Sequence, residues 1–194
     1  MEGIWYPREA EATRLYRLMQ ALGFSDYGAF HRYSVEEPEG FYRALLDHLA
    51  LPWRRPYERA IEGGFPFPRF FTGGALNLTD WTLRHPEGAL ALVHETEDGA
   101  VRSLTYGELK AEVARRAGEL RAFGVERGDR VGLWLPLSLE AALYLLATAH
   151  LGAIAIPIFS GYGAEAAAVR LKDAEAKLLI VQDGFLRRGR RVEL

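Results

Sequence analysis

Two short loops carry the residues whose types and spacing could do chemistry. The first is Phe159-Ser160-Gly161, which Tyr162-Gly163 follows, and its glycines would let a ligand approach the backbone closely. The second is Arg187-Arg188-Gly189-Arg190-Arg191, in which four guanidinium groups could bind phosphates through paired hydrogen bonds. Each has a plainer interpretation: the first also fits a flexible turn between a strand and a helix, and the second a solvated tail.

No complete catalytic set or metal site is expected. The serines lack the Gly-x-Ser-x-Gly pattern, the glycine pairs belong to no Walker or dinucleotide loop, and the chain has no cysteine. His150, on an apolar segment, is expected to be an interior residue. The five histidines stand singly, without metal-ligand spacing: they are His31, His48, His85, His94 and His150.

The composition and charge of the chain argue against two classes of binding partner. The net charge is -2, so neither nucleic acid nor an acidic membrane is expected as a partner, and one short arginine cluster lacks a supporting basic face. The most apolar stretch, residues 133–159, is interrupted by Pro136, Glu140, His150 and Pro157, which argues against a transmembrane helix. Residues 1–7 do not resemble a signal peptide, and a cytoplasmic protein is expected.

Strands alternate with helices between residues 87 and 182. Residues 89–95 and 101–104 flank Asp98-Gly99, which predicts a β-hairpin, and Thr105 with Glu108 predicts a capping box at the start of a helix. Ser138 should cap another helix. The predicted strands are 131–135, 153–159 and 177–181, and the helices between them are 139–151 and 164–174. This alternation predicts parallel βαβ units, hence an α/β fold.

The first 65 residues read as a helical, aromatic-rich segment. Apolar residues recur at helical spacing in 9–22 and 38–51, and the aromatic residues around them are expected to fix these helices onto a larger body. The turn-rich run Gly63–Pro68 marks a seam. We therefore expect an N-terminal helical segment over residues 1–68 and a second domain over 69–194.

The order of several motifs resembles AMP-forming acyl-CoA synthetases of the acetyl-CoA synthetase type, over nearly the whole chain. Thr105-Tyr106-Gly107-Glu108-Leu109 resembles a helix start of the wider adenylate-forming superfamily, and Gly124–Val131 resembles its "G-V-x-x-G-D-R-V" strand entry. The acetyl-CoA synthetase branch is indicated by Arg69–Leu78, Phe159-Ser160-Gly161, Arg170–Lys177, and Asp183 leading into Arg187-Arg188-Gly189-Arg190.

The resemblance implies a function and assigns residues to it. The family activates a carboxylate with ATP (as the magnesium complex) to an acyl-adenylate and then transfers the acyl group to CoA. Arg187 and Arg190 match family arginines that hold the nucleotide phosphates of CoA. Phe159, Ser160 and Gly161 match the loop beside the pantetheine tunnel. Residues 69–194 would then be the first part of an AMP-binding (adenylation) domain, truncated, with an edge strand and an apolar face uncovered.

The family's phosphate loop, Tyr-x-x-Thr-Glu motif, ribose-binding aspartate and C-terminal lysine are absent from the 194 residues. We therefore expect the isolated chain to be inactive as a ligase, and the acyl group stays open. The first alternative is a non-catalytic binding or interaction module, the product of a truncated gene. Such a module could associate with itself, or it could pair with a missing C-terminal portion as half of a split enzyme. A stand-alone Rossmann-like nucleotide binder ranks last.

Overall fold

The computed structural model describes residues 8–64 and 66–193. The absence of a signal peptide, predicted for residues 1–7, concerns residues outside this part. The chain divides into two units, Met1–Leu76 and Asn77–Leu194. The domain boundary predicted at residues 68 and 69 stays a prediction.

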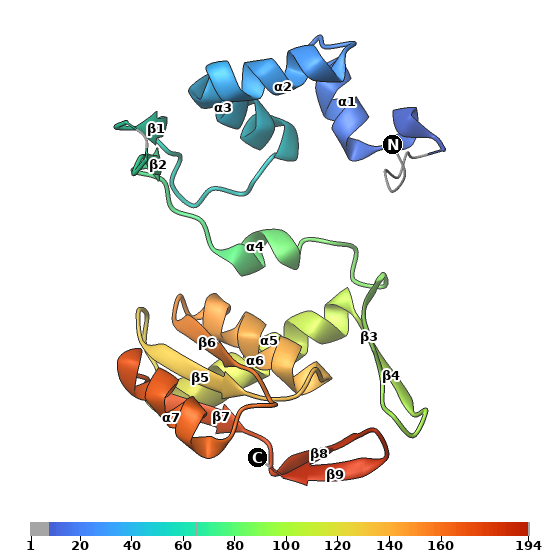
Figure 1. Ribbon diagram of the computed structural model, residues 1–194, viewed down its shortest axis with the longest axis vertical. Helices are drawn as coiled ribbons and strands as arrows, with labels where there is room; N and C mark the ends of the chain where they lie inside the picture. Colours follow the sequence, from blue (N-terminus) through green and yellow to red (C-terminus); the bar gives the residue numbers. More distant parts are fainter. Residues whose placement is uncertain (1–7, 65, 194) are drawn as a thin grey trace. The chain divides into compact units, whose positions relative to one another are not determined.

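Within residues 8–64 and 66–76, the first unit contains three α-helices, a short 3-10 helix and a two-stranded antiparallel sheet (Figure 1). The predicted helix over 9–22 is divided at Thr13, whose hydroxyl oxygen accepts a hydrogen bond from the Tyr16 amide and so begins a new helix. Asp26 caps a helix that the sequence pattern did not predict. The elements are η1 (Ala10–Ala12), α1 (Arg14–Ala21), α2 (Tyr27–Glu36), α3 (Pro38–Leu49), β1 (Arg59–Glu62) and β2 (Arg69–Thr72).

Aromatic rings join the helices of the first unit to its hairpin. Phe30 is buried between α1 and α3, with Phe41 at 5.7 Å from it in an edge-to-face arrangement. Tyr42, the next residue, contacts Phe70 of β2 at 5.3 Å between ring centroids. Both ring pairs lie within the first unit and stabilise its own packing, so the prediction that aromatic residues fix the helices onto a larger body stays a prediction.

A three-stranded parallel sheet, in the order β6-β5-β7, forms the centre of the second unit. The predicted hairpin, capping box and alternation of strands and helices are confirmed. The α/β class is therefore confirmed. The elements are α4 (Leu78–Thr82), β3 (Leu90–Glu95), β4 (Val101–Thr105), α5 (Tyr106–Ala122), β5 (Arg130–Trp134), α6 (Leu139–His150), β6 (Ile154–Ile158), α7 (Ala164–Asp173), β7 (Leu178–Val181), β8 (Gly184–Arg187) and β9 (Arg190–Glu193).

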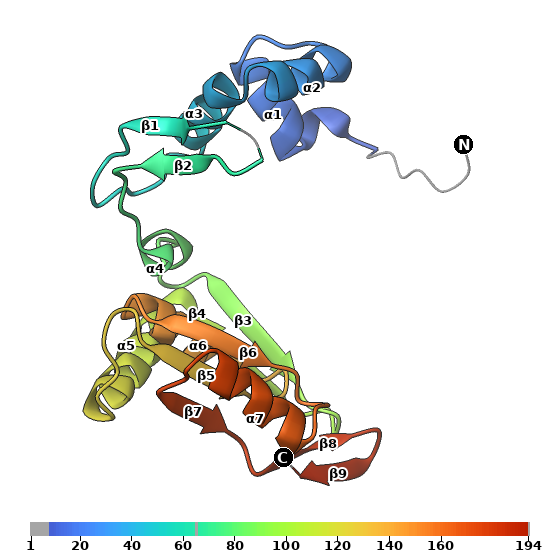
Figure 2. The same ribbon diagram turned by 60° about the vertical axis from the view of Figure 1, so that its left-hand side comes forward.

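Helices cover both faces of this sheet (Figure 2). Successive side chains of β5 point to opposite sides and pack against these helices. Val131 and Leu133 pack with Leu120 of α5 and Ala147 of α6. Trp134 packs on the other face with buried residues of β6 and α7. Gly132 leaves room on that face, since a Cβ there would come within 2.4 Å of a methyl carbon of Leu171.

The sheet ends at β7 on one side, and the uncovered edge strand that the resemblance implies corresponds to this position. Strand β7 lies at one edge, with Leu179 and Val181 exposed, and β6 lies at the other. The last two strands do not extend this sheet but form a separate antiparallel hairpin. Among the described residues, none of the helices is both long enough and apolar enough to cross a membrane.

Candidate functional site

An open groove of about 1240 Å³ lies at the carboxyl ends of β5 and β6, between the β3–β4 and β8–β9 hairpins. This is the place where open α/β sheets bind ligands, because loops replace helices there. Its walls are mostly apolar and include Leu92, Leu135, Pro136, Leu137, Leu145, Phe159, Phe185 and Leu186. The polar residues that line it are His94, Glu95, Thr96, Glu97, Asp98, Ser138, Ser160, Gln182 and Arg187.

The loop after β6 is held by contacts of its own side chains. The Tyr162 amide donates a hydrogen bond to the Phe159 carbonyl at 3.0 Å, and the two rings meet edge to face at 5.6 Å. The Arg170 guanidinium lies over the Tyr162 ring at 4.2 Å. Such cation–π contacts stabilise a ring orientation, so the loop presents Phe159 and Ser160 to the groove in a defined arrangement.

Gly161 belongs to this loop but not to the groove lining. A Cβ at this position would lie 2.4 Å from Cε1 of Phe159. The absence of a side chain therefore lets the Phe159 ring fold back over the backbone. Phe159 itself remains 59% exposed, so its ring is available to a ligand.

The arginine cluster forms a β-hairpin. Arg187 and Arg190 are directly paired across β8 and β9, with Arg188-Gly189 as the two-residue turn. Both turn residues have positive φ, 53° and 71°, as the favoured hairpin turn requires. Directly paired residues point to the same face of a hairpin, so Arg187 and Arg190 place two positive charges side by side.

Neither Arg187 nor Arg190 forms an ion pair or a side-chain hydrogen bond among the described residues. Like charges directly opposite each other destabilise a strand pair. An anion bound between the two guanidinium groups would remove this repulsion. Arg187 lines the groove and Arg190 does not, so the structure brings together Phe159, Ser160 and Arg187, with Gly161 and Arg190 as their neighbours.

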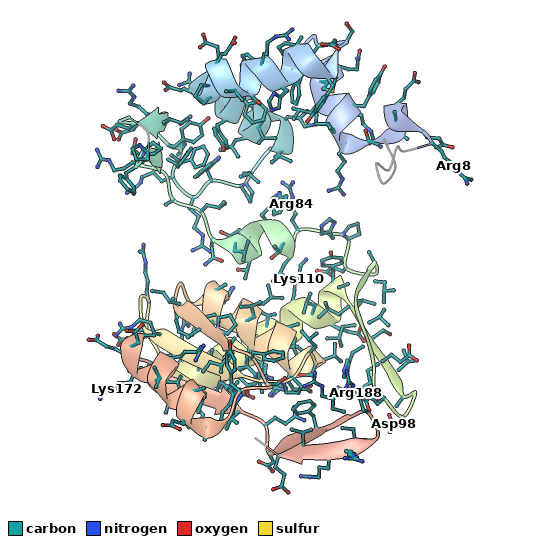
Figure 3. The ribbon with its side chains drawn as sticks, viewed as in Figure 1. Arg8, Arg84, Asp98, Lys110, Lys172 and Arg188 are labelled. Carbon is teal, nitrogen blue, oxygen red and sulfur yellow. The ribbon has the colours of Figure 1, made fainter. Side chains whose placement is uncertain are left out.

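Glu97 is a site residue that sequence reasoning missed. Its carboxylate accepts hydrogen bonds from the amides of Arg188, at 2.7 Å, and Gly189, at 3.0 Å. These bonds, the one from Gly189 first, hold the pKa of Glu97 below its ordinary value, and the charges of Arg187 and Arg188 add to them. Figure 3 labels Asp98 and Arg188 at the two hairpin tips that Glu97 joins. The local pattern Asp98-Gly99 predicts only the turn, not this contact.

The expectation that His150 is interior is wrong. The residue is exposed at the end of α6, and its Nδ1 lies 3.1 Å from the Thr79 hydroxyl oxygen. Asn77 completes this contact, because its side-chain amide donates to the carbonyls of Ala149 and His150. These bonds attach α4 to the end of α6. Within residues 8–64 and 66–193 no three metal-ligating side chains come together.

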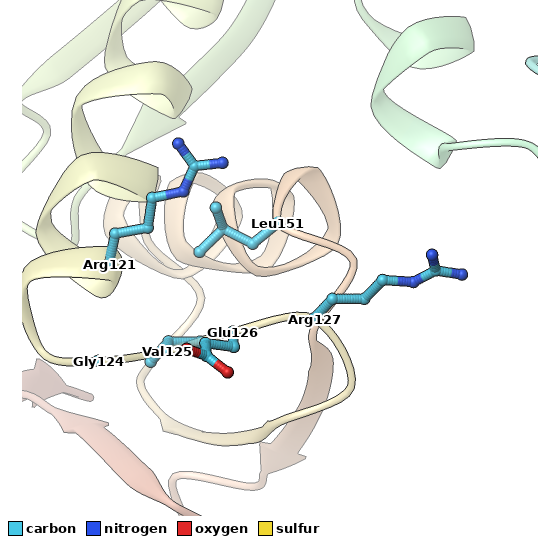
Figure 4. Close-up of a pocket in the computed structure, with 6 residues that line it drawn as sticks. All are labelled: Arg121, Gly124, Val125, Glu126, Arg127 and Leu151. Atoms are coloured by element: carbon cyan, nitrogen blue, oxygen red, sulfur yellow. The ribbon is translucent and has the colours of Figure 1, made fainter.

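A smaller pocket of about 410 Å³ lies where α5 and α6 end (Figure 4). It is lined by Arg121, Gly124, Val125, Glu126, Arg127 and Leu151. Arg121 belongs to the last turn of α5, where a cation offsets the negative end of the helix dipole. Lys177 acts similarly by donating a hydrogen bond to the Gly124 carbonyl. This stabilising role accounts for Arg121 without a ligand.

Comparison with known families matches the two parts of the chain to two family models. Residues 78–193 match the AMP-binding enzyme family, and residues 27–80 match the acetyl-coenzyme A synthetase N-terminus. The first match covers more than half of the chain and includes the whole groove.

Individual relatives agree. An acetyl-coenzyme A synthetase of Thiobacillus denitrificans is 36% identical over 98% of this chain and 29% of its own length. A 3-hydroxypropionyl-coenzyme A synthetase of Sulfurisphaera tokodaii is 39% identical over 87% of this chain and 26% of its own. Among solved structures, acetoacetyl-CoA synthetase from Streptomyces lividans superimposes with a TM-score of 0.87 and 30% identity, over 94% of this chain and 30% of that one. The chain thus spans under a third of these relatives.

Proposed function

Because the chain belongs to the AMP-binding enzyme family, we propose that it supplies part of the CoA side of an AMP-forming acyl-CoA ligase. In that reaction a carboxylate oxygen attacks the α-phosphorus of ATP and releases pyrophosphate. The thiol of CoA then attacks the acyl carbon and releases AMP, and its proton passes to solvent or a base. The substrates are a small carboxylic acid, ATP as its magnesium complex, and CoA.

The observation that carries the proposal is that Arg187 and Arg190 lie opposite each other beside an apolar groove. Neither side chain has an ion-pair partner among the described residues. CoA joins a phosphorylated nucleotide to a long pantetheine arm. Arginine side chains bind phosphate oxygens through paired hydrogen bonds, and an apolar groove can hold the arm. The proposed CoA site therefore consists of Arg187, Arg190, Phe159, Ser160 and Gly161.

Each of these residues has a role that follows from its chemistry. Arg187 and Arg190 neutralise phosphate charge. The Phe159 ring contacts the methylene groups of the arm, and the Ser160 hydroxyl donates to or accepts from its amides. Gly161 keeps Phe159 in place by leaving room for its ring. No step of bond making is assigned to these five residues, which bind and orient one substrate.

The proposal includes the inactivity of the 194 residues alone. The sequence contains no phosphate loop for ATP and no lysine equivalent to the one that supports adenylation in the family. We expect no exchange of radioactive pyrophosphate into ATP with acetate, 3-hydroxypropionate or acetoacetate, the acids of the relatives named above. Measurable exchange by this chain would refute this part of the proposal.

Isothermal titration with CoA tests the binding site. We expect binding by the wild-type chain and an affinity at least about tenfold weaker after the double change Arg187→Ala, Arg190→Ala, because two charge-assisted contacts are lost. The matched control is Arg121→Ala, Arg127→Ala, which removes the same charge from the smaller pocket. Equal weakening in both double variants would show a nonspecific charge effect and would refute the site.

A second candidate function is an interaction module, and the exposure of the groove walls favours it. Leu137 is 97% exposed and Leu186 is 53% exposed, and both line the groove. A second copy of the chain, or a chain with the remaining family motifs, could cover these residues. Light scattering over a range of concentrations separates the two candidates, because a monomer that binds CoA supports the ligase and a dimer indifferent to CoA supports the module. A cytoplasmic location stays a prediction.

A further inference from the structure

The strongest feature outside the proposed CoA contacts is the bond between the two hairpin tips. Glu97 follows β3, and its two carboxylate oxygens accept separately from the amides of Arg188 and Gly189, 91 and 92 positions further along the chain. Its neighbour Asp98 is used locally, because its carboxylate accepts from the Thr96 hydroxyl and the Ala100 amide. The turn of β3–β4 is thus stabilised by Asp98, which leaves Glu97 to contact the other hairpin.

The turn of β8–β9 is shaped to receive an anion. Arg188 and Gly189 both have positive φ, and their amides are not used by the ladder that pairs Arg187 with Arg190. Two successive amides in such a turn form a concave backbone site for negative charge. The Glu97 carboxylate occupies this site, so a phosphate bound by the arginines must be held by their side chains.

Little else fixes the position of the β8–β9 hairpin. Apart from the Glu97 bonds, the one hydrogen bond that reaches the described part of this hairpin from outside is from the Gln182 side chain to the Gly184 carbonyl, at 2.8 Å. Gln182 is only two residues away and belongs to the same connection. Within the part of the chain that the structure describes, no ion pair joins residues 184–193 to another element. The carboxylate of Glu97 is therefore the principal polar attachment of the arginine pair to the groove.

We propose that Glu97 is a positioning residue, which holds the β8–β9 hairpin against β3–β4 and so aims Arg187 and Arg190 at the phosphates of CoA. The identity of the ligand in this inference rests on the proposed function. The attachment of the hairpin by Glu97 rests on the hydrogen bonds alone. In this proposal Glu97 acts through the two arginines and not through a contact of its own with CoA. The hydrogen bonds lower the pKa of Glu97 from its ordinary value of 4.5, so the carboxylate is ionised and able to accept both bonds at neutral pH.

Two measurements on the same variants test this role. The first is amide hydrogen exchange at Arg188 and Gly189, in the wild-type chain and in Glu97→Ala, Glu97→Gln and Glu95→Ala. We expect exchange at both amides to rise at least about fivefold in Glu97→Ala, because both acceptors are lost. Glu97→Gln keeps one acceptor oxygen and should protect one amide more than the other. Glu95 also lines the groove but has no bond to the turn, so Glu95→Ala controls for loss of charge.

The second measurement is the CoA affinity of the same four proteins, with their urea unfolding midpoints. We expect affinity to fall about three- to tenfold in Glu97→Ala, less in Glu97→Gln and least in Glu95→Ala, while the midpoints stay close together. A gain of affinity in Glu97→Ala would overturn the inference, since the carboxylate would then only repel the ligand. Unchanged exchange, or faster exchange with unchanged affinity, would overturn it as well. If the wild-type chain does not bind CoA, the proposed function fails, and the exchange rates alone decide whether Glu97 holds the hairpin.

Discussion

The packed side of the parallel sheet and the groove at its carboxyl end are built in opposite ways. In the first, Leu120 and Val131 are completely buried between two helices and the sheet. In the second, Leu137 and Phe159 are 97% and 59% exposed, and hydrogen bonds between hairpin tips join segments far apart in the chain. The comparison teaches that burial stabilises the fold, whereas the groove depends on a few polar contacts that contribute little to stability.

The largest expected effect is on the packed side. Leu120→Ala should lower the free energy of unfolding by about 2–5 kcal/mol, because it leaves a cavity in the core. The matched change Leu137→Ala should alter it by less than about 0.5 kcal/mol, since that side chain is exposed. Urea unfolding measures both, and similar losses in the two variants would contradict the comparison.

A smaller effect is expected from glycine packing. Gly132→Ala should cost about 1–3 kcal/mol of unfolding free energy, because its Cβ would meet Leu171 at 2.4 Å and Leu179 at 3.1 Å. Gly118, within α5, has no atom near its would-be Cβ, and Gly118→Ala should stabilise by about 0.4–1 kcal/mol. Thermal unfolding of both variants checks that the free energy of unfolding falls in Gly132→Ala and rises in Gly118→Ala. An unchanged free energy of unfolding in Gly132→Ala would show that α7 packs loosely.

The capping box should contribute less again. Thr105 accepts from the Glu108 amide at 3.3 Å while Glu108 accepts from the Thr105 amide at 2.8 Å. Thr105→Ala should cost about 1 kcal/mol of unfolding free energy. Ser103→Ala, two residues earlier on the same strand β4, removes a hydroxyl from an exposed position that caps no helix and serves as control. Equal stability of the two variants would mean that tertiary packing alone starts α5.

The smallest expected effect depends on pH. Hydrogen bonds from Lys177 and from the Glu126 amide, both at 2.7 Å, hold the pKa of Asp129 below its ordinary value of 3.8. A depressed carboxyl pKa stabilises the folded state fully above 3.8, and this stabilisation is lost as pH falls through the lower pKa of the folded state.

Asp129→Asn should therefore be less stable than wild type at neutral pH, and the difference should shrink in acid. Urea unfolding at several pH values measures this difference. Glu126→Gln is the control, because that side chain has no hydrogen bond or ion pair among the described residues. A difference that grows in acid would show that the sign is wrong.

The packed side of the sheet could be predicted from the sequence far better than the groove. The apolar run of β5 and the caps at Thr105 and Ser138 are local signals, so the helices and strands of the sheet could be predicted from such signals. The arginine hairpin was not predicted, although Arg188-Gly189 is a two-residue turn. Glu97 could not be found, because its partners lie more than 90 positions away and no local pattern marks them.

In the first unit, α2 and the β1–β2 hairpin were also missed. The aromatic residues of this unit recur without a clear period. Their presence suggested that they anchor the helices, but their spacing did not show which segments form a helix and which form a strand. Only the ring contacts, such as Tyr42 with Phe70, show how the segments are joined.

The most direct test of the account is a map of amide NMR shifts as CoA is added to the wild-type chain. The account predicts that the shifts concentrate in the Phe159–Gly161 loop and in residues 184–190, which flank the groove, and spare the core around Leu120 and Val131. Shifts centred on the pocket of Arg121 and Arg127, or no shifts at saturating CoA, would contradict it.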